Sequence, residues 1–312
     1  MIATVTLNPS LDEWVDLPTL RLGELNRSSG FIRYPGGKGI NVSRVVRELG
    51  GRTHAVALAG GEDGAILRTA LQRLSIPHEF VTISGSTRNN YKIRTERPRA
   101  LTEINTAGPR VSSTAVRRLE HRLLTRRPRP RCVVLSGSLP PGASPSLYAR
   151  WIRALRREGI PTVLDASGEP LRQGVRARPW LVKPNRQEAE ELLRTRLTHL
   201  RHAVAAVQAL LRLGPAIVIL SMGRDGALMG CRSPSGIWLA HPPVVRVSSA
   251  VGAGDSLVGG FLVGWLRGAG FLEALRLGVA CGAASAMTPG TELCHRADVR
   301  RVLPRVTIRR VT

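Results

Sequence analysis

Short apolar runs alternate along the chain with longer segments in which apolar residues recur at helical spacing. The apolar runs have the length of buried strands and cover residues 2–7, 55–58, 132–135, 162–164, 181–182 and 216–220. The helical segments between them cover residues 40–49, 65–74, 145–157, 186–193 and 200–213. This alternation predicts an α/β fold in which a mostly parallel central sheet is covered by helices.

Two further stretches have the pattern of antiparallel strands. Residues 12–34 and 88–105 carry apolar and polar side chains in turn. We expect these stretches to pair into a small sheet above the carboxyl edge of the main sheet. Such a sheet would act as a lid that excludes water from a reaction, and its exposed strand edges would favour a homodimer.

The composition is that of one globular domain over residues 1–312. Hydrophobic residues make up 43% of the chain, and there is neither an internal repeat nor a linker. No apolar run reaches the roughly 18 residues of a membrane span. The four cysteines match no zinc or CxxC spacing, and the first strand begins without a basic leader. We therefore expect a cytoplasmic protein with reduced thiols.

The chain is strongly basic, with 46 Lys and Arg against 22 Asp and Glu and a formal net charge of +24. One explanation is affinity for nucleic acid. The other is that the base composition of the genome favours arginine codons and that the charges are solvated at the surface. Aromatic residues are only 4% of the chain and do not interleave with the basic clusters, so we expect no specific nucleic-acid partner. A positive field would also attract a phosphorylated substrate and a nucleotide.

Lysine is rare, because it occupies only Lys38, Lys92 and Lys183 and the other 43 basic residues are arginines. An ammonium group is a compact point charge, whereas a guanidinium group is a broad planar fork. The three lysines are therefore candidates for positions where arginine cannot serve.

The segment Val251-Gly252-Ala253-Gly254-Asp255 carries the clearest chemical signal. It lies between a β-like run at 240–247 and an apolar, helix-forming stretch at 257–266. The glycines permit a tight turn, and the unpaired N–H groups of a helix start can hold phosphate oxygens. The Asp255 carboxylate could accept a proton from an attacking hydroxyl. The simpler explanation is an aspartate that caps a helix after a glycine turn.

A second glycine-rich turn, Gly36-Gly37-Lys38-Gly39-Ile40-Asn41, also precedes a helix and lacks the spacing of a Walker A loop. Asp12 follows the first strand. Its carboxylate could accept hydrogen bonds from two sugar hydroxyls, or could simply stabilise a turn. Ser138 follows another strand, at the edge where ligands bind in such sheets. Arg88 lies in the expected lid and could bind a phosphate through two hydrogen bonds.

Lys183-Pro184-Asn185-Arg186-Gln187-Glu188 ends a strand and opens a helix. Asn185 and Glu188 share a helix face, so they could hold Mg²⁺ beside nucleotide phosphates, or could form a capping box. Ser221, Gly223 and Gly226 follow the strand at 216–220 and could line a nucleotide pocket, or form an ordinary turn.

Taken in order, these motifs resemble those of the ribokinase-like sugar kinases, and specifically the phosphofructokinase-B branch. The resemblance runs from LNPSLD at 7–12 through GGKGINV, SGSLPPG, DASGE, LVKPNRQE and VGAGDS to GTELC at 290–294. It implies a ribokinase-like three-layer sandwich and an ATP- and Mg²⁺-dependent kinase. It also implies a K⁺ site, for which the carbonyls of residues 248–250 could serve.

The resemblance implies roles for the motif residues. The catalytic base would be Asp255, with an anion hole formed by the N–H groups of residues 251–254. The sugar phosphate would be bound by Asp12, Arg27, Gly37, Lys38, Asn41, Arg88 and Ser138. The nucleotide would be bound by Lys183, Asn185, Ser221, Gly223, Gly226 and Val251, and the metal by Asn185 and Glu188.

The acceptor is harder to choose. The lysine of GGKG resembles 1-phosphofructokinases and tagatose-6-phosphate kinases, whereas MTPGTELC followed by His-Arg-Ala-Asp resembles minor 6-phosphofructokinases. On balance the sequence predicts phosphorylation of fructose 6-phosphate to fructose 1,6-bisphosphate. An unphosphorylated-sugar or nucleoside kinase, and a basic regulatory or nucleic-acid-binding protein on the same fold, are the alternatives. Lys38 and Arg88 argue against the former, and the intact Asp255 against the latter.

Overall fold

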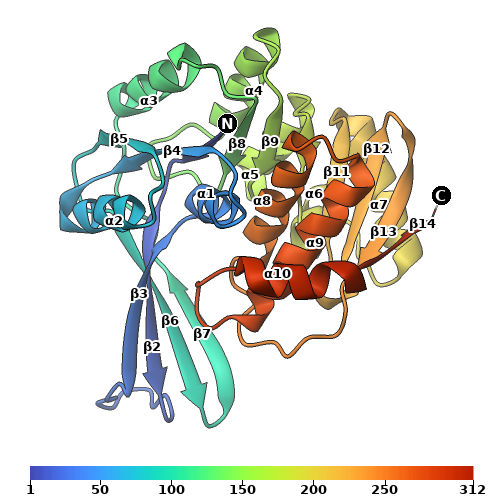
Figure 1. Ribbon diagram of the computed structural model, residues 1–312. Helices are drawn as coiled ribbons and strands as arrows, with labels where there is room; N and C mark the ends of the chain where they lie inside the picture. The colour runs from blue at the N-terminus through green and yellow to red at the C-terminus, as the bar shows by residue number, and fades with distance from the viewer. Residues whose placement is uncertain (312) are drawn as a thin grey trace.

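The computed structural model describes residues 1–311 and contains two β-sheets (Figure 1). The larger sheet has ten strands in the order β14-β13-β12-β11-β10-β9-β8-β1-β4-β5. The seven strands from β11 to β5 are parallel. Their bounds are β1 Ile2–Thr6, β4 Thr53–Ala59, β5 His78–Thr82, β8 Cys132–Ser136, β9 Thr162–Asp165, β10 Leu181–Val182 and β11 Ile217–Ser221. The predicted α/β fold with a mostly parallel sheet is confirmed.

Three antiparallel strands extend the sheet at one edge. They are β12 Ala227–Arg232, β13 Ser235–His241 and β14 Thr307–Arg310. The strand expected over 240–247 is wrong beyond His241, because Pro242 and Pro243 have no N–H to donate to a ladder. Val244 is 92% exposed there, so this segment runs as a loop toward the start of α8.

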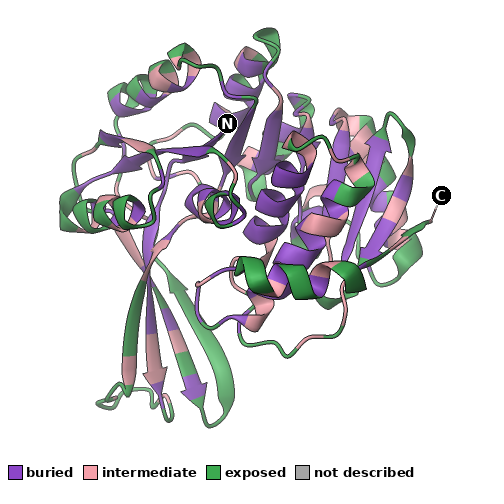
Figure 2. Ribbon diagram, viewed as in Figure 1, coloured by how far each residue is buried: buried purple, intermediate pink, exposed green. Residues whose placement is uncertain are grey.

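Helices cover both faces of the large sheet, which makes the fold a three-layer sandwich. One face carries α1 Lys38–Glu48, α2 Gly61–Arg73, α8 Ala253–Leu266, α9 Phe271–Met287 and α10 Arg296–Val302. The other carries α3 Ser113–Thr125, α4 Leu147–Arg157, α5 Gly168–Arg176, α6 Arg186–Leu193 and α7 Leu200–Leu213. Short 3₁₀ turns occupy Gly223–Asp225 and Leu303–Arg305. Figure 2 shows the sheet and helix α8 as the buried interior.

The predicted lid is present as a four-stranded sheet in the order β3-β2-β6-β7, and it projects from the body of the molecule (Figure 1). Its strands are β2 Ser10–Leu17, β3 Gly30–Gly36, β6 Arg88–Glu96 and β7 Arg99–Asn105. The outer pairs are antiparallel as expected, but the central pair β2–β6 is parallel. That register places Asp12, Asn90 and Asn105 beside one another on one face of the lid.

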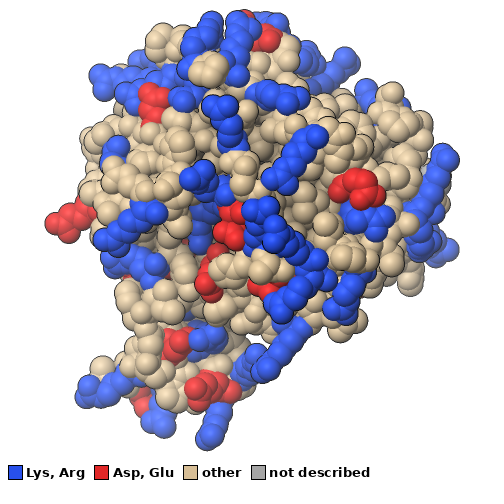
Figure 3. Space-filling view, in the orientation of Figure 1, with Lys and Arg blue, Asp and Glu red and all other residues tan. Residues whose placement is uncertain are grey.

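Three further features concern helix length, the cysteines and the surface charge. No helix of residues 1–311 is long and apolar enough to cross a membrane. The four cysteines are free and buried. Figure 3 shows basic side chains spread over the visible face, from the helices at the top to the lid at the bottom. On this face the charge does not gather into a single stripe.

Candidate active site

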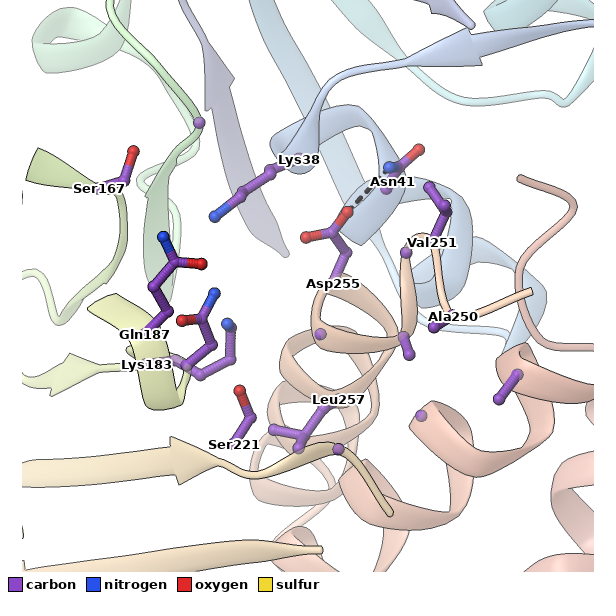
Figure 4. Close-up of a pocket in the computed structure, with 18 of the residues that line it drawn as sticks. Lys38, Asn41, Ser167, Lys183, Gln187, Ser221, Ala250, Val251, Asp255 and Leu257 are labelled. Carbon is purple, nitrogen blue, oxygen red and sulfur yellow. Dashed lines mark hydrogen bonds between the residues drawn. The ribbon is translucent and has the colours of Figure 1, made fainter. Parts of the chain in front are cut away.

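A cavity of about 1590 Å³ lies between the lid, the carboxyl ends of the parallel strands and the start of α8. The structure brings nearly all of the predicted site residues to this cavity. Its lining includes Asp12, Gly37, Lys38, Asn41, Arg88, Ser138, Lys183, Asn185, Ser221, Gly223, Gly226, Val251, Gly252, Ala253, Gly254 and Asp255. Figure 4 shows side chains from several of these elements converging on one space.

Two of the predicted residues do not line the cavity. Arg27 lies in the exposed connection between β2 and β3, away from the cavity of its own chain. Glu188 is buried in the first turn of α6 and contacts Lys38, which does line the cavity. The sugar-phosphate role of Arg27 stays a prediction.

Asp255 lies in the first turn of α8 and is only 6% exposed. Its Oδ2 accepts a hydrogen bond of 2.8 Å from Asn41 Nδ2, drawn as a dashed line in Figure 4. Burial and the neighbouring Asp165 charge raise the pKa of Asp255 to about 7, although Lys38, the Asn41 hydrogen bond and Lys183 pull it down. A carboxyl group with a pKa near neutrality can accept a proton at physiological pH.

The start of α8 offers backbone N–H groups beside this carboxylate. In the described part of the chain, the N–H groups of Gly252, Gly254 and Asp255 have no acceptor. Val251 N–H donates to Ser249 Oγ at 3.2 Å, and Ala253 N–H donates to Ala250 O at 3.3 Å. Of the expected anion hole over 251–254, the N–H groups of Gly252 and Gly254 are therefore the ones available to an anion.

A buried carboxylate, Asp165, bridges two of the three lysines. Lys38 Nζ lies 2.9 Å from its Oδ1 and Lys183 Nζ lies 3.2 Å from its Oδ2. Burial alone would raise the pKa of Asp165, but Lys183 and Lys38 hold it below its ordinary value. Burial would lower the pKa of Lys38, yet Asp165 and Glu188 raise it. The Lys38 ammonium is therefore charged, and both lysines are held beside the cavity by Asp165.

Lys38 reaches into the cavity from the first turn of α1. Its ammonium faces Asp165 and lies 3.5 Å from Glu188 Oε1. Figure 4 shows its side chain reaching from α1 toward the middle of the site, beside Asp255. A Cβ atom on Gly254 would lie 3.3 Å from Lys183 Nζ, so the start of α8 approaches the second lysine closely.

The capping-box explanation of the Asn185 pair is confirmed. Asn185 Oδ1 accepts from Glu188 N at 2.8 Å, and Glu188 Oε2 accepts from Asn185 N at 2.9 Å. Glu188 Oε1, the oxygen outside the capping box, lies 3.5 Å from Lys38 Nζ. Among the described residues no cluster of three or more His, Cys, Asp or Glu could hold a metal ion. The one carboxylate oxygen of Glu188 outside the capping box fits Mg²⁺ held mainly by nucleotide phosphates and water.

On its lid side, the cavity has groups that can accept hydrogen bonds from hydroxyls, and it has cationic side chains. Asp12 Oδ1 accepts from Ser10 Oγ at 2.9 Å and from Asn90 Nδ2 at 3.1 Å. A Cβ atom on Gly36 would lie 2.7 Å from the Asp12 carboxylate, which explains the glycine there. Arg88 donates to the carbonyls of Asn8 and Thr106, and burial lowers its pKa.

The remaining predicted residues line the cavity from strand ends and turns. Ser138 Oγ accepts from Asn8 Nδ2 at 3.2 Å. Ser221 Oγ donates to the Pro184 carbonyl at 3.4 Å, beside the capping box. Gly226 has a φ of +87°, and a Cβ atom there would lie 2.1 Å from Ala240 O, so only glycine fits this turn.

Several residues that border the site were not predicted. Asp165 occurs in the DASGE motif, which carried no role of its own in the sequence analysis. Lys92 is 4% exposed on the cavity face of the lid, where it pairs with Glu103 and hydrogen-bonds Asn105 at 3.2 Å. All three lysines of the chain therefore line one cavity. The scarcity of lysine was the signal that could have identified Lys92.

Comparisons with known proteins agree with this arrangement. The sequence profile described as "pfkB family carbohydrate kinase" matches residues 5–298. The chain is 36% identical over 311 residues to the 1-phosphofructokinase of Bacillus subtilis (strain 168), covering all of both chains. It is 35% identical to the ATP-dependent 6-phosphofructokinase isozyme 2 of Mycobacterium tuberculosis (strain ATCC 25618 / H37Rv), over 96% of this chain and 88% of that protein. The crystal structure of phosphofructokinase-2 from Escherichia coli in complex with potassium has a TM-score of 0.91 at 32% identity, over 97% of this chain and 98% of that one.

Proposed function

The chain belongs to the pfkB family of carbohydrate kinases, and we propose that it transfers the γ-phosphoryl group of ATP to fructose 6-phosphate, giving fructose 1,6-bisphosphate. It is a phosphofructokinase-type sugar kinase, and therefore a phosphotransferase with an alcohol acceptor. The choice of fructose 6-phosphate rests on the MTPGTELC segment and on the relative from M. tuberculosis that carries that activity in its name.

One observation carries the proposal. A buried carboxylate with a pKa of about 7, Asp255, lies at the free N–H groups of α8, across from two lysines. Phosphoryl transfer needs a proton acceptor for the attacking hydroxyl and fixed positive charge for the transferring group. This arrangement supplies both in one cavity.

In the proposed step, Asp255 accepts the proton of the sugar's free primary hydroxyl. The hydroxyl oxygen forms a bond to the γ-phosphorus, the bond from that phosphorus to the bridging oxygen breaks, and ADP leaves. The free N–H groups of Gly252 and Gly254, with Lys38, face the charge on the transferring group. Mg²⁺, when bound with the nucleotide near Glu188, supplies further neutralisation of phosphate charge.

The two ends of the cavity suit the two substrates. Asp12 and Asn90 offer hydrogen-bond partners to sugar hydroxyls, and Arg88 and Lys92 offer cations to the sugar phosphate. Lys183, Asn185, Ser221, Gly223, Gly226 and Val251 line the nucleotide end. An apolar wall formed by Val247, Leu257 and Ala283 is available there for a base. We expect a cytoplasmic homodimer, with K⁺ bound near the carbonyls of residues 248–250, as the potassium complex of the E. coli neighbour suggests.

Fructose 1-phosphate is the second candidate acceptor, because Lys38 stands in a GGKG turn and the B. subtilis relative is named a 1-phosphofructokinase. A coupled assay of ADP release with MgATP should compare fructose 6-phosphate, fructose 1-phosphate, tagatose 6-phosphate and free fructose. A higher kcat/KM for fructose 6-phosphate supports the proposal. A higher kcat/KM for fructose 1-phosphate would identify that sugar phosphate as the acceptor instead. Turnover of none of them, or only of free fructose, contradicts a phosphohexose kinase.

The pH dependence of kcat/KM should report the proposed base. Because burial raises the pKa of Asp255 to about 7, the carboxylate is protonated below that pH and cannot accept the hydroxyl proton. We expect kcat/KM for the sugar to fall as the pH drops through about 7, measured from about pH 5.5 to about pH 9. A profile that stays flat down to about pH 5 would contradict the assignment of Asp255.

Replacement of Lys92 by Met should weaken sugar-phosphate binding. The side chain is buried on the cavity face of the lid, away from Asp255, so its loss should raise KM for the phosphohexose about 10- to 100-fold with little change in kcat. Arg99→Met, on the exposed lid strand β7, removes the same charge and serves as the matched control. Equal KM values for Lys92→Met and Arg99→Met would exclude Lys92 from the sugar site.

A further inference from the structure

A partly buried arginine on α1, Arg44, contacts three separate segments of the chain. Arg44 Nη1 donates to Asn41 Oδ1 at 3.3 Å and to the Pro35 carbonyl at 3.1 Å. Its Nη2 donates to the Glu292 carbonyl at 3.3 Å. Burial lowers the pKa of Arg44 to about 10, while Asp12, Tyr34, Glu292 and Asp255 favour its charged form. The guanidinium is therefore a partly buried cation with three hydrogen-bond partners.

We propose that Arg44 is a positioning residue, which sets the orientation of the Asn41 carboxamide and through it holds the Asp255 carboxylate in place for proton transfer. The inference rests on the proposed function, because it concerns the base of that reaction. Neither the sequence motifs nor the proposed step above gives Arg44 a role.

The orientation of the Asn41 amide is decided by its two neighbours. Its oxygen accepts from the Arg44 guanidinium, and its nitrogen donates to Asp255 Oδ2 at 2.8 Å. The reverse orientation would point the amide NH₂ at a cation and the amide oxygen at a carboxylate, so both contacts would be repulsive. Arg44 and Asn41 are three residues apart on α1, which places them on one helix face.

The same guanidinium connects this pair to the base of the lid. Pro35 lies in β3, and Glu292 lies in the segment between α9 and α10. That segment also accepts a hydrogen bond of 2.9 Å from Trp14 Nε1 of β2 to Thr291 Oγ1. Arg44 is thus held from two sides, which restricts the guanidinium and makes the Asn41 contact a fixed one.

The charged groups that face Asp255 come from several elements. Asp165 lies at the end of β9, Lys38 on α1 and Lys183 after β10, and they act on the carboxylate together with the Asn41 hydrogen bond. The charge of Arg44 also acts on Asp255, and that effect is lost when Arg44 is replaced by Met. An effect that passes through the amide therefore depends on Asn41, whereas an effect of charge or stability does not.

A double-mutant cycle separates these routes. Arg44→Met should lower kcat about 10- to 100-fold through misorientation, and it should move the acid limb of the kcat/KM profile to higher pH. In the Asn41→Ala background there is no amide to orient, so Arg44→Met should cause a clearly smaller shift of that limb, which comes from the loss of charge alone. Arg47→Met, on the exposed face of α1, is the matched control and should leave the profile unchanged.

Equal shifts of the pH limb in both backgrounds, or no shift in either, would overturn the proposal. If Arg44→Met does not fold, Arg44→Lys carries the same test, because a single ammonium cannot serve Asn41, Pro35 and Glu292 together. The ¹³C carboxyl resonance of Asp255, assigned with Asp255→Asn, should be titrated without substrate in all four proteins. That titration tests Arg44 even if no phosphohexose is turned over, so failure of the proposed function and failure of this inference are distinguishable.

Discussion

Replacement of Asp255 by Asn is expected to lower kcat by about 10²- to 10⁴-fold, the usual contribution of a general base. The carboxamide oxygen can still accept the hydrogen bond from Asn41 Nδ2, so the shape of the site is kept while the proton acceptor is lost. The nucleotide Kd should change little, because the lining at the nucleotide end is untouched. Single-turnover kinetics and calorimetric titration of the nucleotide measure the two quantities separately.

The stability of Asp255→Asn provides an internal control. Burial raises the pKa of this carboxyl in the folded protein, so its ionised form opposes folding and the penalty grows as the pH rises toward the folded pKa. The Asn variant should therefore have a Tm at pH 8 no lower than that of the wild type. Asp298→Asn, on α10, is the matched substitution outside the cavity and should retain full activity. Retention of more than about a tenth of the wild-type kcat by Asp255→Asn would exclude Asp255 as the base.

Replacement of Lys38 by Met is expected to lower kcat/KM about 100-fold, with most of the loss in kcat. The ammonium lies 2.9 Å from Asp165 and beside Asp255, so in the proposed reaction it would face the transferring phosphoryl group. Because Lys38 lowers the pKa of Asp255, its loss should also move the acid limb of the pH profile to higher pH.

A charge-preserving variant tests the geometry of Lys38. Lys38→Arg keeps the cation but replaces a compact ammonium with a planar fork, so we expect activity between those of the wild type and Lys38→Met. Steady-state kinetics with each substrate varied would show whether the activity is lost in kcat, in KM for ATP or in KM for the phosphohexose. A loss confined to KM for the phosphohexose would return Lys38 to a purely sugar-phosphate role, and no loss would remove it from the site.

The alternation of apolar runs and helical segments was sufficient to predict the parallel core. Buried strands such as 132–135 are apolar at every position because both of their faces are covered, and this makes them visible in the sequence. Helices α8 and α9 are apolar on nearly all sides, since each packs against the other and the sheet. Helix α9 therefore has no clear apolar stripe, and the pattern did not identify it.

Local chemistry also predicted much of the site. Each glycine turn before a helix, at residues 36–39 and 252–254, is a property of a few consecutive residues. The capping box of Asn185 and Glu188 is equally local, because its two hydrogen bonds span three residues. Such features depend on backbone conformation and neighbouring side chains, so a sequence can specify them alone.

The sequence by itself thus determined the fold class, the presence of a lid and the identity of many, but not all, of the residues at the cavity. Only the tertiary structure decided how those residues are paired. Asp165 meets Lys38 across 127 positions of the chain, and Asn41 meets Asp255 across 214. The parallel pairing of β2 with β6 decided that Lys92 faces the cavity. Contacts between distant segments depend on how strands and helices pack, and no local pattern of residues encodes that packing.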